Sequence, residues 1–343
     1  MSIRIFTHLT GSLADTAAHA REVEAHGFDG VESIEAAHDP FFPLLLAAAN
    51  TDRLQLMTGV AIGFARSPMT LANVAHDLNA FSKGRFTLGL GSQIKPHVTR
   101  RFSMPWSRPA ARMREMVQAI KAIFAAWYDG APLSFQGEFY THTLMPPAFV
   151  PKDTTYGKPS IGIAAVGPLM TEAAGAVGDV LLLHPFTSEA YLRNVTLPHL
   201  KAGLTGANRA EGACRVLHDP LIVTGSAPEM FDRARQAAAS QIAFYASTPA
   251  YRVVLEQHGW GDLQPRLQDM TRSGRWSEMG ALITDEMLRT LAIVGEPADI
   301  APIIWKRYGD TVVDFALSSS IVDRPTMARV ATDLRACATG TNR

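Results

Sequence analysis

The sequence predicts an α/β fold in which eight parallel strands alternate with helices and close into a (β/α)8 barrel of the TIM type. Short apolar runs of strand length alternate with helical patterns, and one segment has the full pattern of a strand–helix–strand unit. With 343 residues, 47% of them apolar, the chain can bury one large core, and we expect a single domain over residues 1–343. The predicted strands are Ile3–Thr7, Gly30–Ile34, Leu54–Ile62, Phe86–Leu90, Ser160–Ala164, Asp179–Leu183, Asp219–Thr224 and Val312–Leu317.

The clearest unit lies between residues 54 and 91. Its first strand, Leu54–Ile62, leads into a turn where Ser67 is placed to cap a helix. Pro68 follows at a first-turn position that needs no N–H group. Apolar side chains then recur at helical spacing until a lysine-glycine pair ends the helix before the buried strand Phe86–Leu90. Such a unit implies parallel strands joined by a right-handed crossover.

Two further helices are predicted from amphipathic stripes. Ser12 and Asp15 have the spacing of a capping box at the start of the first helix. The stripes consist of Leu13, Ala17, Ala20 and Val23 in the first helix and Met113, Val117, Ile120, Phe124 and Trp127 in the second.

Three insertions interrupt the alternation of strands and helices. One follows strand four (Ser92–Pro109), one precedes strand five (Pro132–Lys158), and one separates strands seven and eight (Gly225–Asp310). The second should form a hairpin around Gln136-Gly137. Loops of this length in a compact barrel are usually lids or binding elements. The third carries an aromatic run that either forms an apolar wall over the site or only packs the inserted helices onto the barrel: Tyr245, Tyr251 and Trp260.

The composition excludes several classes of partner. The 32 basic and 32 acidic side chains give no net charge, which removes the electrostatic basis for binding nucleic acid or an anionic membrane. No secretion signal and no apolar run of about 20 residues is visible. The two cysteines lack metal-ligand spacing, so no metal site is expected. We expect a cytoplasmic protein that acts on a small molecule.

Candidate site residues follow from the barrel itself, because the active sites of such barrels lie in the loops after the carboxyl ends of the strands. This rule selects Glu35, His38, Asp39, Phe64, Arg66, Ser67, Ser92, Gln93, His97, Val166, Gly167, Pro168, His184, Thr224 and Gly225. The turn Val166-Gly167-Pro168 is the best anion site, because a helix start presents free N–H groups and the positive end of its dipole. The alternative is that this turn makes only a tight connection.

The motifs TGV, ARSP, SKGRF and LGLG occur in this order between residues 58 and 91. Together they resemble the bacterial-luciferase-like superfamily of flavin-dependent monooxygenases and of oxidoreductases that use the deazaflavin coenzyme F420. The resemblance implies hydride transfer between the deazaflavin and an organic substrate. Three alternatives stay open: an FMN-dependent monooxygenase that uses reduced flavin and oxygen, a flavin-binding barrel without catalysis, and a cofactor-independent lyase that uses Glu35.

The resemblance also implies a set of cofactor contacts. The segment AAVGPLMTEAAG looks like the one that binds the cofactor phosphate in the family. The family carries a non-prolyl cis peptide against the flavin ring at the place of Gly59-Val60. The cofactor-binding residues implied are Gly59, Val60, Ser92, His97, Val166, Gly167 and Pro168.

The predicted catalytic residues are His38 and Glu35. Deazaflavin-dependent relatives often have an acidic residue followed directly by histidine after strand two, whereas here Ala36 follows Glu35 and the histidine comes two residues later. Either His38 reaches the site from a differently shaped loop, or this subgroup works without an imidazole there. Phe64 and Trp106 are expected to contact substrate. Family members are commonly homodimers, which we expect here too.

Overall fold

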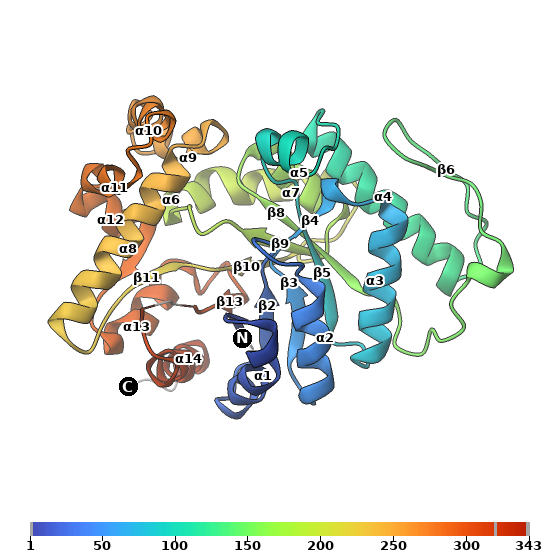
Figure 1. Cartoon of the computed structure of the whole chain (residues 1–343), viewed down its shortest axis with the longest axis horizontal. Coiled ribbons are helices and arrows are strands. Elements are labelled where there is room, and N and C mark those ends of the chain that lie inside the picture. The colour runs from blue at the N-terminus through green and yellow to red at the C-terminus, as the bar shows by residue number, and fades with distance from the viewer. Residues whose placement is uncertain (1–2, 319–320, 341–343) are drawn as a thin grey trace.

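The structure, a computed structural model, describes residues 3–318 and 321–340. Within these ranges eight parallel strands form a ring in the order β3-β2-β1-β13-β10-β9-β8-β5, and β5 pairs back with β3, so the barrel is closed (Figure 1). The predicted (β/α)8 barrel is confirmed. Its strands are β1 (Arg4–His8), β2 (Gly30–Ser33), β3 (Gln55–Thr58), β5 (Phe86–Gly91), β8 (Ser160–Ala165), β9 (Val180–Leu183), β10 (Arg215–His218) and β13 (Asp314–Ala316).

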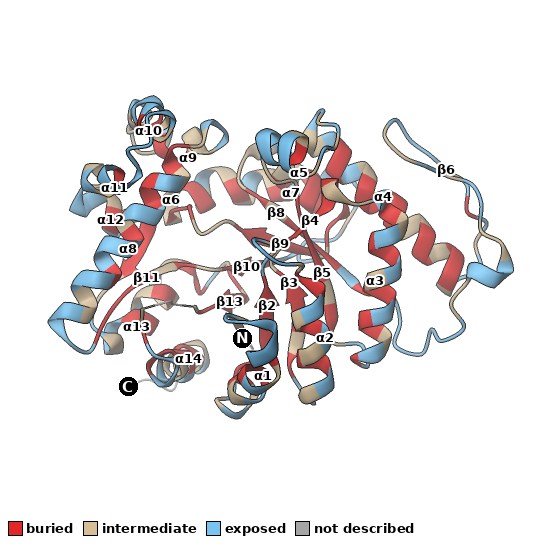
Figure 2. Cartoon of the chain, in the orientation of Figure 1, coloured by how far each residue is buried: buried red, intermediate tan, exposed pale blue. Residues whose placement is uncertain are grey.

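Helices cover the outside of the ring and bury one face each (Figure 2). Ser67 caps its helix as predicted, because its hydroxyl accepts the N–H of Thr70 at 3.2 Å. The predicted capping box is wrong, because the Ser12 hydroxyl donates to the Asp15 carboxylate at 2.6 Å and caps no backbone N–H. The covering helices are α1 (Thr16–Ala25), α2 (Phe41–Asn50), α3 (Pro68–Phe81), α4 (Pro109–Tyr128), α5 (Pro168–Val177), α6 (Glu189–Tyr191), α7 (Leu197–Gly206), α13 (Pro297–Tyr308) and α14 (Arg324–Thr339).

The third strand is broken at the mouth of the barrel. Beyond β3 it resumes as β4 (Ala61–Ile62), and the peptide bond Gly59-Val60 between the two pieces is cis. Met57 pairs with Thr87 on β5, and Ala61 pairs with Leu90, so three residues on this strand oppose two on β5. This count defines a bulge.

The predicted seventh strand, Asp219–Thr224, is wrong, because the strand of the barrel lies a few residues earlier in the sequence. The barrel strand is β10, and Pro220, which lacks an N–H group, follows where the ladder ends. The apolar run beyond it forms β11 (Leu221–Val223), which pairs outside the ring with β12 (Ala292–Val294). Asp219 therefore lies at the catalytic end of the barrel, where the prediction had placed Thr224 and Gly225.

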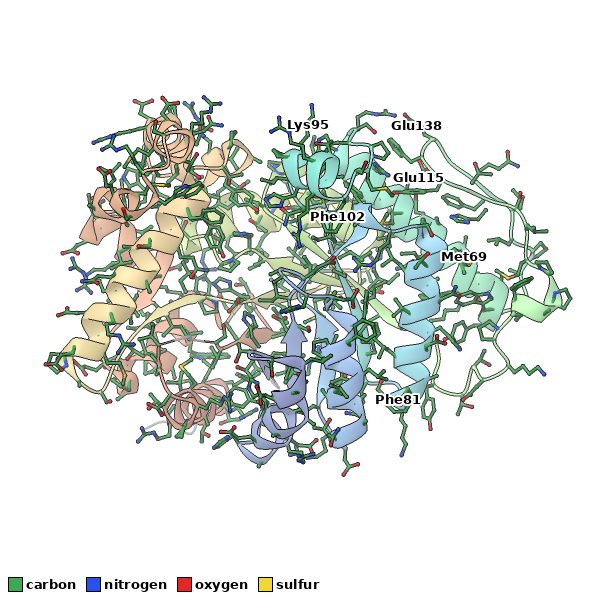
Figure 3. All side chains as sticks on the ribbon, in the orientation of Figure 1. Met69, Phe81, Lys95, Phe102, Glu115 and Glu138 are labelled. Atoms are coloured by element: carbon green, nitrogen blue, oxygen red, sulfur yellow. The ribbon has the colours of Figure 1, made fainter. Side chains whose placement is uncertain are left out.

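The insertions lie on opposite sides of the barrel (Figure 1). The arm before β8 contains the predicted hairpin, β6 (Phe135–Gln136) and β7 (Thr141–His142). Its turn is held by Glu115 of α4, whose carboxylate accepts the N–H groups of residues 138, 139 and 140 (Figure 3). The long insertion between β11 and β12 consists of α8 (Pro228–Ala246), α9 (Arg252–Glu256), α10 (Leu263–Arg272), α11 (Trp276–Met279) and α12 (Asp285–Leu291).

Candidate active site

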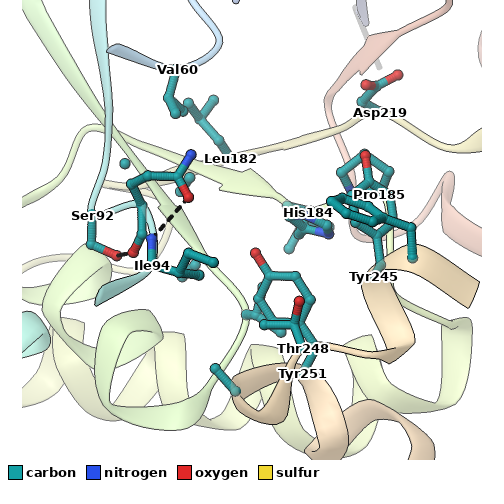
Figure 4. A pocket seen from close by; sticks show the side chains of 18 of the residues that line it. Val60, Ser92, Ile94, Leu182, His184, Pro185, Asp219, Tyr245, Thr248 and Tyr251 are labelled. Carbon is teal, nitrogen blue, oxygen red and sulfur yellow. Dashed lines mark hydrogen bonds between the residues drawn. The ribbon is translucent and has the colours of Figure 1, made fainter. Parts of the chain in front are cut away.

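A cavity of about 1560 Å³ lies at the carboxyl ends of the barrel strands (Figure 4). The strands and the loops that follow them supply one side, and the long insertion supplies the other. Residues from seven strand ends line it: His8, Glu32, Val60, Ser92, Val166, His184 and Asp219. The insertion adds Tyr245, Thr248 and Tyr251. This placement matches the usual position of active sites in such barrels.

The structure brings the predicted cofactor-binding residues together. Gly59, Val60, Ser92, His97, Val166, Gly167 and Pro168 all line the cavity. They come from the loops after β3, β5 and β8, and β5 is hydrogen-bonded to both neighbours. Because β3 and β8 flank β5, the bulge after β3 and the N-terminus of α5 lie on one wall of the cavity.

The start of α5 has the features of an anion site. Gly167 is the N-cap residue, and the first helical hydrogen bond runs from Thr171 N to Gly167 O at 3.1 Å. The N–H groups of Leu169 and Met170 precede that bond, and no side chain caps the helix. A Cβ atom added at Gly167 would have nothing within 4 Å. The space beside the first turn of α5 is therefore open.

The predicted catalytic residues lie in different surroundings. Glu35 lines the cavity, but its carboxylate accepts Ile62 N at 2.7 Å and pairs with Arg66 at 2.6 Å. Arg66 also pairs with Asp39 at 3.0 Å, so these charges tie the loop after β2 to the loop after β4. His38 is exposed and does not line the cavity. In this structure Glu35 is therefore engaged in an ion pair at the edge of the cavity, and His38 lies outside the cavity lining.

The predicted aromatic wall is only partly assembled. Trp106, Tyr245 and Tyr251 line the cavity. Phe64 does not line it, because it is fully buried behind Trp106 with the ring centroids 5.8 Å apart. Trp260 stacks on His258 at 4.7 Å within the core of the insertion and does not line the cavity either.

A buried cluster of three titratable groups forms the floor of the cavity, and sequence reasoning missed it. His8 Nε2 lies 3.2 Å from Glu32 Oε2 and 3.2 Å from Asp219 Oδ2. The other oxygen of Glu32 is buried without a hydrogen-bond partner among the described residues. A Cβ atom at Gly59 would lie 2.9 Å from Glu32 Oε2, so the carboxylate sits directly behind the bulge. His8, which follows the predicted first strand, was the available signal.

The environment shifts the pKa of two groups in this cluster. Burial, the largest influence on His8, lowers the pKa of the imidazole, but Asp219 and Glu32 outweigh burial and raise the pKa to about 10. Burial also raises the pKa of the Glu32 carboxyl, and the hydrogen bond from His8 opposes this rise. His8 is thus a cation at neutral pH, held between two carboxyl groups.

His218 makes folding sensitive to acid. Burial lowers the pKa of this histidine to about 4, and its Nδ1 has no hydrogen-bond partner among the described residues. Because the folded-state pKa lies below the unfolded value of about 6.5, its contribution is intact above pH 6.5 and is lost as the pH falls towards 4. At about 1.4 kcal/mol per pKa unit, this loss reaches about 3 kcal/mol.

Urea unfolding at pH 7 and pH 4.5 measures this effect. We expect the fall in unfolding free energy between the two pH values to be smaller in His218→Leu than in the wild-type protein. An equal fall in both proteins would show that other groups dominate the acid response.

Comparison with known proteins identifies the family. The family model for luciferase-like monooxygenases matches residues 2–314. The chain therefore belongs to the luciferase-like monooxygenase family, whose members are oxidoreductases or monooxygenases. None of the helices in the described part of the chain is long and apolar enough to cross a bilayer.

Individual relatives support the same family. An uncharacterized protein of Mycobacterium tuberculosis is 50% identical over 313 residues, which cover 90% of this chain and 92% of that protein. The 5,10-methylenetetrahydromethanopterin reductase of Archaeoglobus fulgidus is 30% identical over 267 residues, 75% of this chain and 74% of the reductase. The structure of the coenzyme F420-dependent tetrahydromethanopterin reductase from Methanopyrus kandleri has a TM-score of 0.77 at 19% identity and covers 96% of this chain and 97% of its own. That last similarity shows a shared fold.

Proposed function

We propose that this protein transfers a hydride between a deazaflavin cofactor of the F420 type and an organic substrate. The observation that carries the proposal is the single wall that joins the bulge at Gly59-Val60 to the open start of α5. A ring lying on the bulge would place its phosphate-bearing tail at the helix N-terminus. The motifs between residues 58 and 91 and the similarity to the coenzyme F420-dependent reductase from Methanopyrus kandleri support the choice of deazaflavin.

The charges around the cavity fit an anionic tail. Lys95 and Arg108 line the cavity from the loop after β5, the strand next to β8, and Arg108 also pairs with Glu138 of the arm. Lys95 is exposed, so its ammonium group is free to meet a tail that extends towards solvent (Figure 3). When bound, the deazaflavin would supply the carbon that gives or takes the hydride.

The His8–Glu32–Asp219 cluster is the proposed proton-handling group, in place of His38. His8 and Asp219 are partly exposed to the cavity, with 14% and 18% of their side-chain surfaces accessible. The elevated pKa of Glu32 lets this carboxyl hold a proton behind the bulge, and His8 links it to Asp219. Glu35 keeps the loops around the bulge in position through Arg66.

Cofactor titration tests the proposed function. The purified chain should bind the deazaflavin coenzyme F420 more tightly than FMN, measured by the change in cofactor fluorescence. Tighter binding of FMN would favour a flavin monooxygenase, and tight binding without turnover would indicate a barrel that has lost catalysis. Binding of neither cofactor would overturn the proposal and favour a cofactor-independent reaction.

A side chain at position 167 should interfere with the tail of the cofactor. Gly167→Val adds a branched side chain in open space at the helix start, and we expect cofactor affinity to fall at least about tenfold, or about 1.4 kcal/mol. Gly206→Val is the matched control, because Gly206 is exposed, has equally open surroundings and lies at the far end of α7. Unchanged affinity in a folded Gly167→Val protein would remove this site.

We also propose that the protein is a homodimer. The arm and the end of α3 expose large apolar side chains, with 76% exposure for Leu144, 71% for Phe149 and 54% for Phe81. Phe81 is labelled at the end of α3 in Figure 3. Apolar groups that gather on one side of a barrel suit a self-complementary contact. Sedimentation at micromolar concentration should show a dimer that Leu144→Glu with Phe149→Glu dissociates. A wild-type monomer at that concentration would refute the dimer.

A further inference from the structure

One end of the cavity is occupied by aromatic rings around a histidine. His184 follows β9, and Tyr245 and Tyr251 reach it from the long insertion (Figure 4). The ring centroids of the two tyrosines lie 4.5 and 4.6 Å from the imidazole. This end of the cavity faces the proposed ring site at Val60, which lies across the cavity from the histidine.

The tautomer of His184 is fixed by the backbone. Nδ1 of the imidazole accepts the N–H of Phe186 at 3.0 Å. A ring nitrogen that accepts a hydrogen bond carries no proton, so the proton of the neutral ring is on Nε2. No residue in the described part of the chain accepts a hydrogen bond from Nε2. A donor is therefore available to the cavity.

The ring is also uncharged at neutral pH. Burial lowers the pKa of His184 to about 4, and the nearby Asp219 carboxylate only partly opposes this effect. The tyrosines differ in their hydroxyl groups. Tyr245 OH accepts a hydrogen bond from Gln241 at 2.8 Å, whereas Tyr251 OH has no partner among the described residues. Tyr251 is thus a second donor available at this end.

The surroundings favour an uncharged ligand with a large apolar part. Among the described residues, the lysine and arginine side chains that line the cavity are Lys95 and Arg108, and both follow β5. Near His184 the Asp219 carboxylate is paired with the His8 cation, so this end offers no unpaired positive charge to an anion. The lining from the loops after β9 and β10 and from the insertion is largely apolar or aromatic (Pro185, Leu221, Ile222, Ala238 and Phe244), and its polar members, such as Gln241 and Thr248, are uncharged. Such a pocket orients a ligand through few polar contacts.

We propose that His184 Nε2 binds a neutral carbonyl oxygen of the substrate, with Tyr251 as second donor, and that the substrate is an aryl or alicyclic ketone or aldehyde. This inference rests on the proposed function, because that function requires an organic substrate beside the cofactor ring. It adds the class of substrate and the side chain that recognises it. His184 is a substrate-binding residue in this scheme, and proton handling stays with the cluster at His8.

Two probes of nearly equal shape test the proposal. Acetophenone carries the carbonyl oxygen, and α-methylstyrene replaces C=O by C=CH2. Their dissociation constants are measured by calorimetry on the full chain, with and without coenzyme F420. In His184→Asn the amide oxygen can still accept the N–H of Phe186, but the donor at Nε2 is lost; His184→Gln places an amide N–H near the position of Nε2.

We expect the ratio of the two dissociation constants, acetophenone over α-methylstyrene, to rise about tenfold in His184→Asn. The ratio should stay within about threefold of the wild-type value in His184→Gln. The infrared carbonyl band of bound acetophenone should lie at lower wavenumber in the wild-type and His184→Gln proteins than in His184→Asn. A role of His184 in structure alone would leave this band unmoved.

An unchanged ratio in His184→Asn, or a wild-type protein that does not bind acetophenone at millimolar concentration, would overturn the inference. The fluorescence titration with coenzyme F420 separates this failure from that of the proposed function. If the cofactor binds and the ratio does not change, only the carbonyl site is wrong. If the ratio changes and the cofactor does not bind, the carbonyl site stands and the proposed hydride transfer falls.

Discussion

A His8→Asn variant is expected to lose roughly 3–5 kcal/mol of unfolding free energy at pH 7. Removal of the imidazolium leaves the carboxyl groups of Glu32 and Asp219 without the cation that each contacts at 3.2 Å. Glu32 is 4% exposed and cannot be rehydrated, so without His8 its carboxyl would either keep an unpaired charge or take up a proton, and both outcomes are costly. Adding Glu32→Gln should restore a large part of the loss, because it removes the buried ionisable group as well.

The contribution of His8 to the unfolding free energy should decrease as the pH rises. Because the folded-state pKa of His8 is about 10, above the unfolded value of about 6.5, its contribution is intact below pH 6.5 and is lost as the pH rises through 10. The difference in unfolding free energy between the wild-type protein and His8→Asn, measured by urea unfolding, should therefore narrow towards pH 10.

The same variant should also lose activity. On any substrate that the wild-type protein converts, turnover of His8→Asn should fall roughly 10²–10⁴-fold. A variant with normal turnover and stability would show that the cluster is dispensable.

The second large effect is expected at Arg85. Its guanidinium group donates to the carbonyl oxygens of Ala48, Thr51, Leu54 and Ser82 at 2.7–3.1 Å, and to the Thr51 hydroxyl at 3.2 Å. These acceptors belong to buried residues between α2, β3 and α3. Arg85→Met leaves them without donors, and we expect a loss on the order of 3 kcal/mol in unfolding free energy.

Two comparisons make this measurement specific. Arg85→Lys keeps the charge but offers a more compact group with three donors, so it should recover only part of the loss. Arg100→Met should change stability by less than about 0.5 kcal/mol, because the Arg100 side chain is exposed and makes no ion pair or hydrogen bond with the described residues. Equal losses at positions 85 and 100 would contradict the assigned role of Arg85.

The sequence could predict the barrel because its signals are local. The alternation of elements, the cap at Ser67 and the hairpin before β8 depend on neighbours within a few residues. The prediction of the seventh strand was wrong because it also relied on a local signal. The run from residue 221 to 223 is more apolar than β10, which contains Arg215 and His218. Only its pairing with residues 292–294 shows that it lies outside the ring.

In the candidate site, too, local signals predicted some residues, and contacts between distant segments determine the others. The rule of strand ends selected Ser92 and the start of α5, which both line the cavity, because each follows its strand directly. Val60 came from the family resemblance, because the predicted third strand ran past it to Ile62. His8, Glu32 and Asp219 meet only because β1, β2 and β10 come together in the closed barrel. These strands are far apart in the sequence, so the spacing of residues along the chain does not predict the cluster. Likewise, nothing in the local pattern distinguishes the buried Phe64 from Trp106 at the cavity surface.

The pairing of β11 with β12 has a consequence for how this scaffold can diversify. It joins residues 221–223 to residues 292–294, so the segment that carries Tyr245 and Tyr251 leaves and re-enters the barrel at one point. The entropic cost of closing such a loop grows only with the logarithm of its length. The segment can therefore be exchanged, shortened or extended while the bulge, the start of α5 and the cluster at His8 stay in place. In this architecture one side of the cavity can change without rebuilding the side formed by the barrel strands.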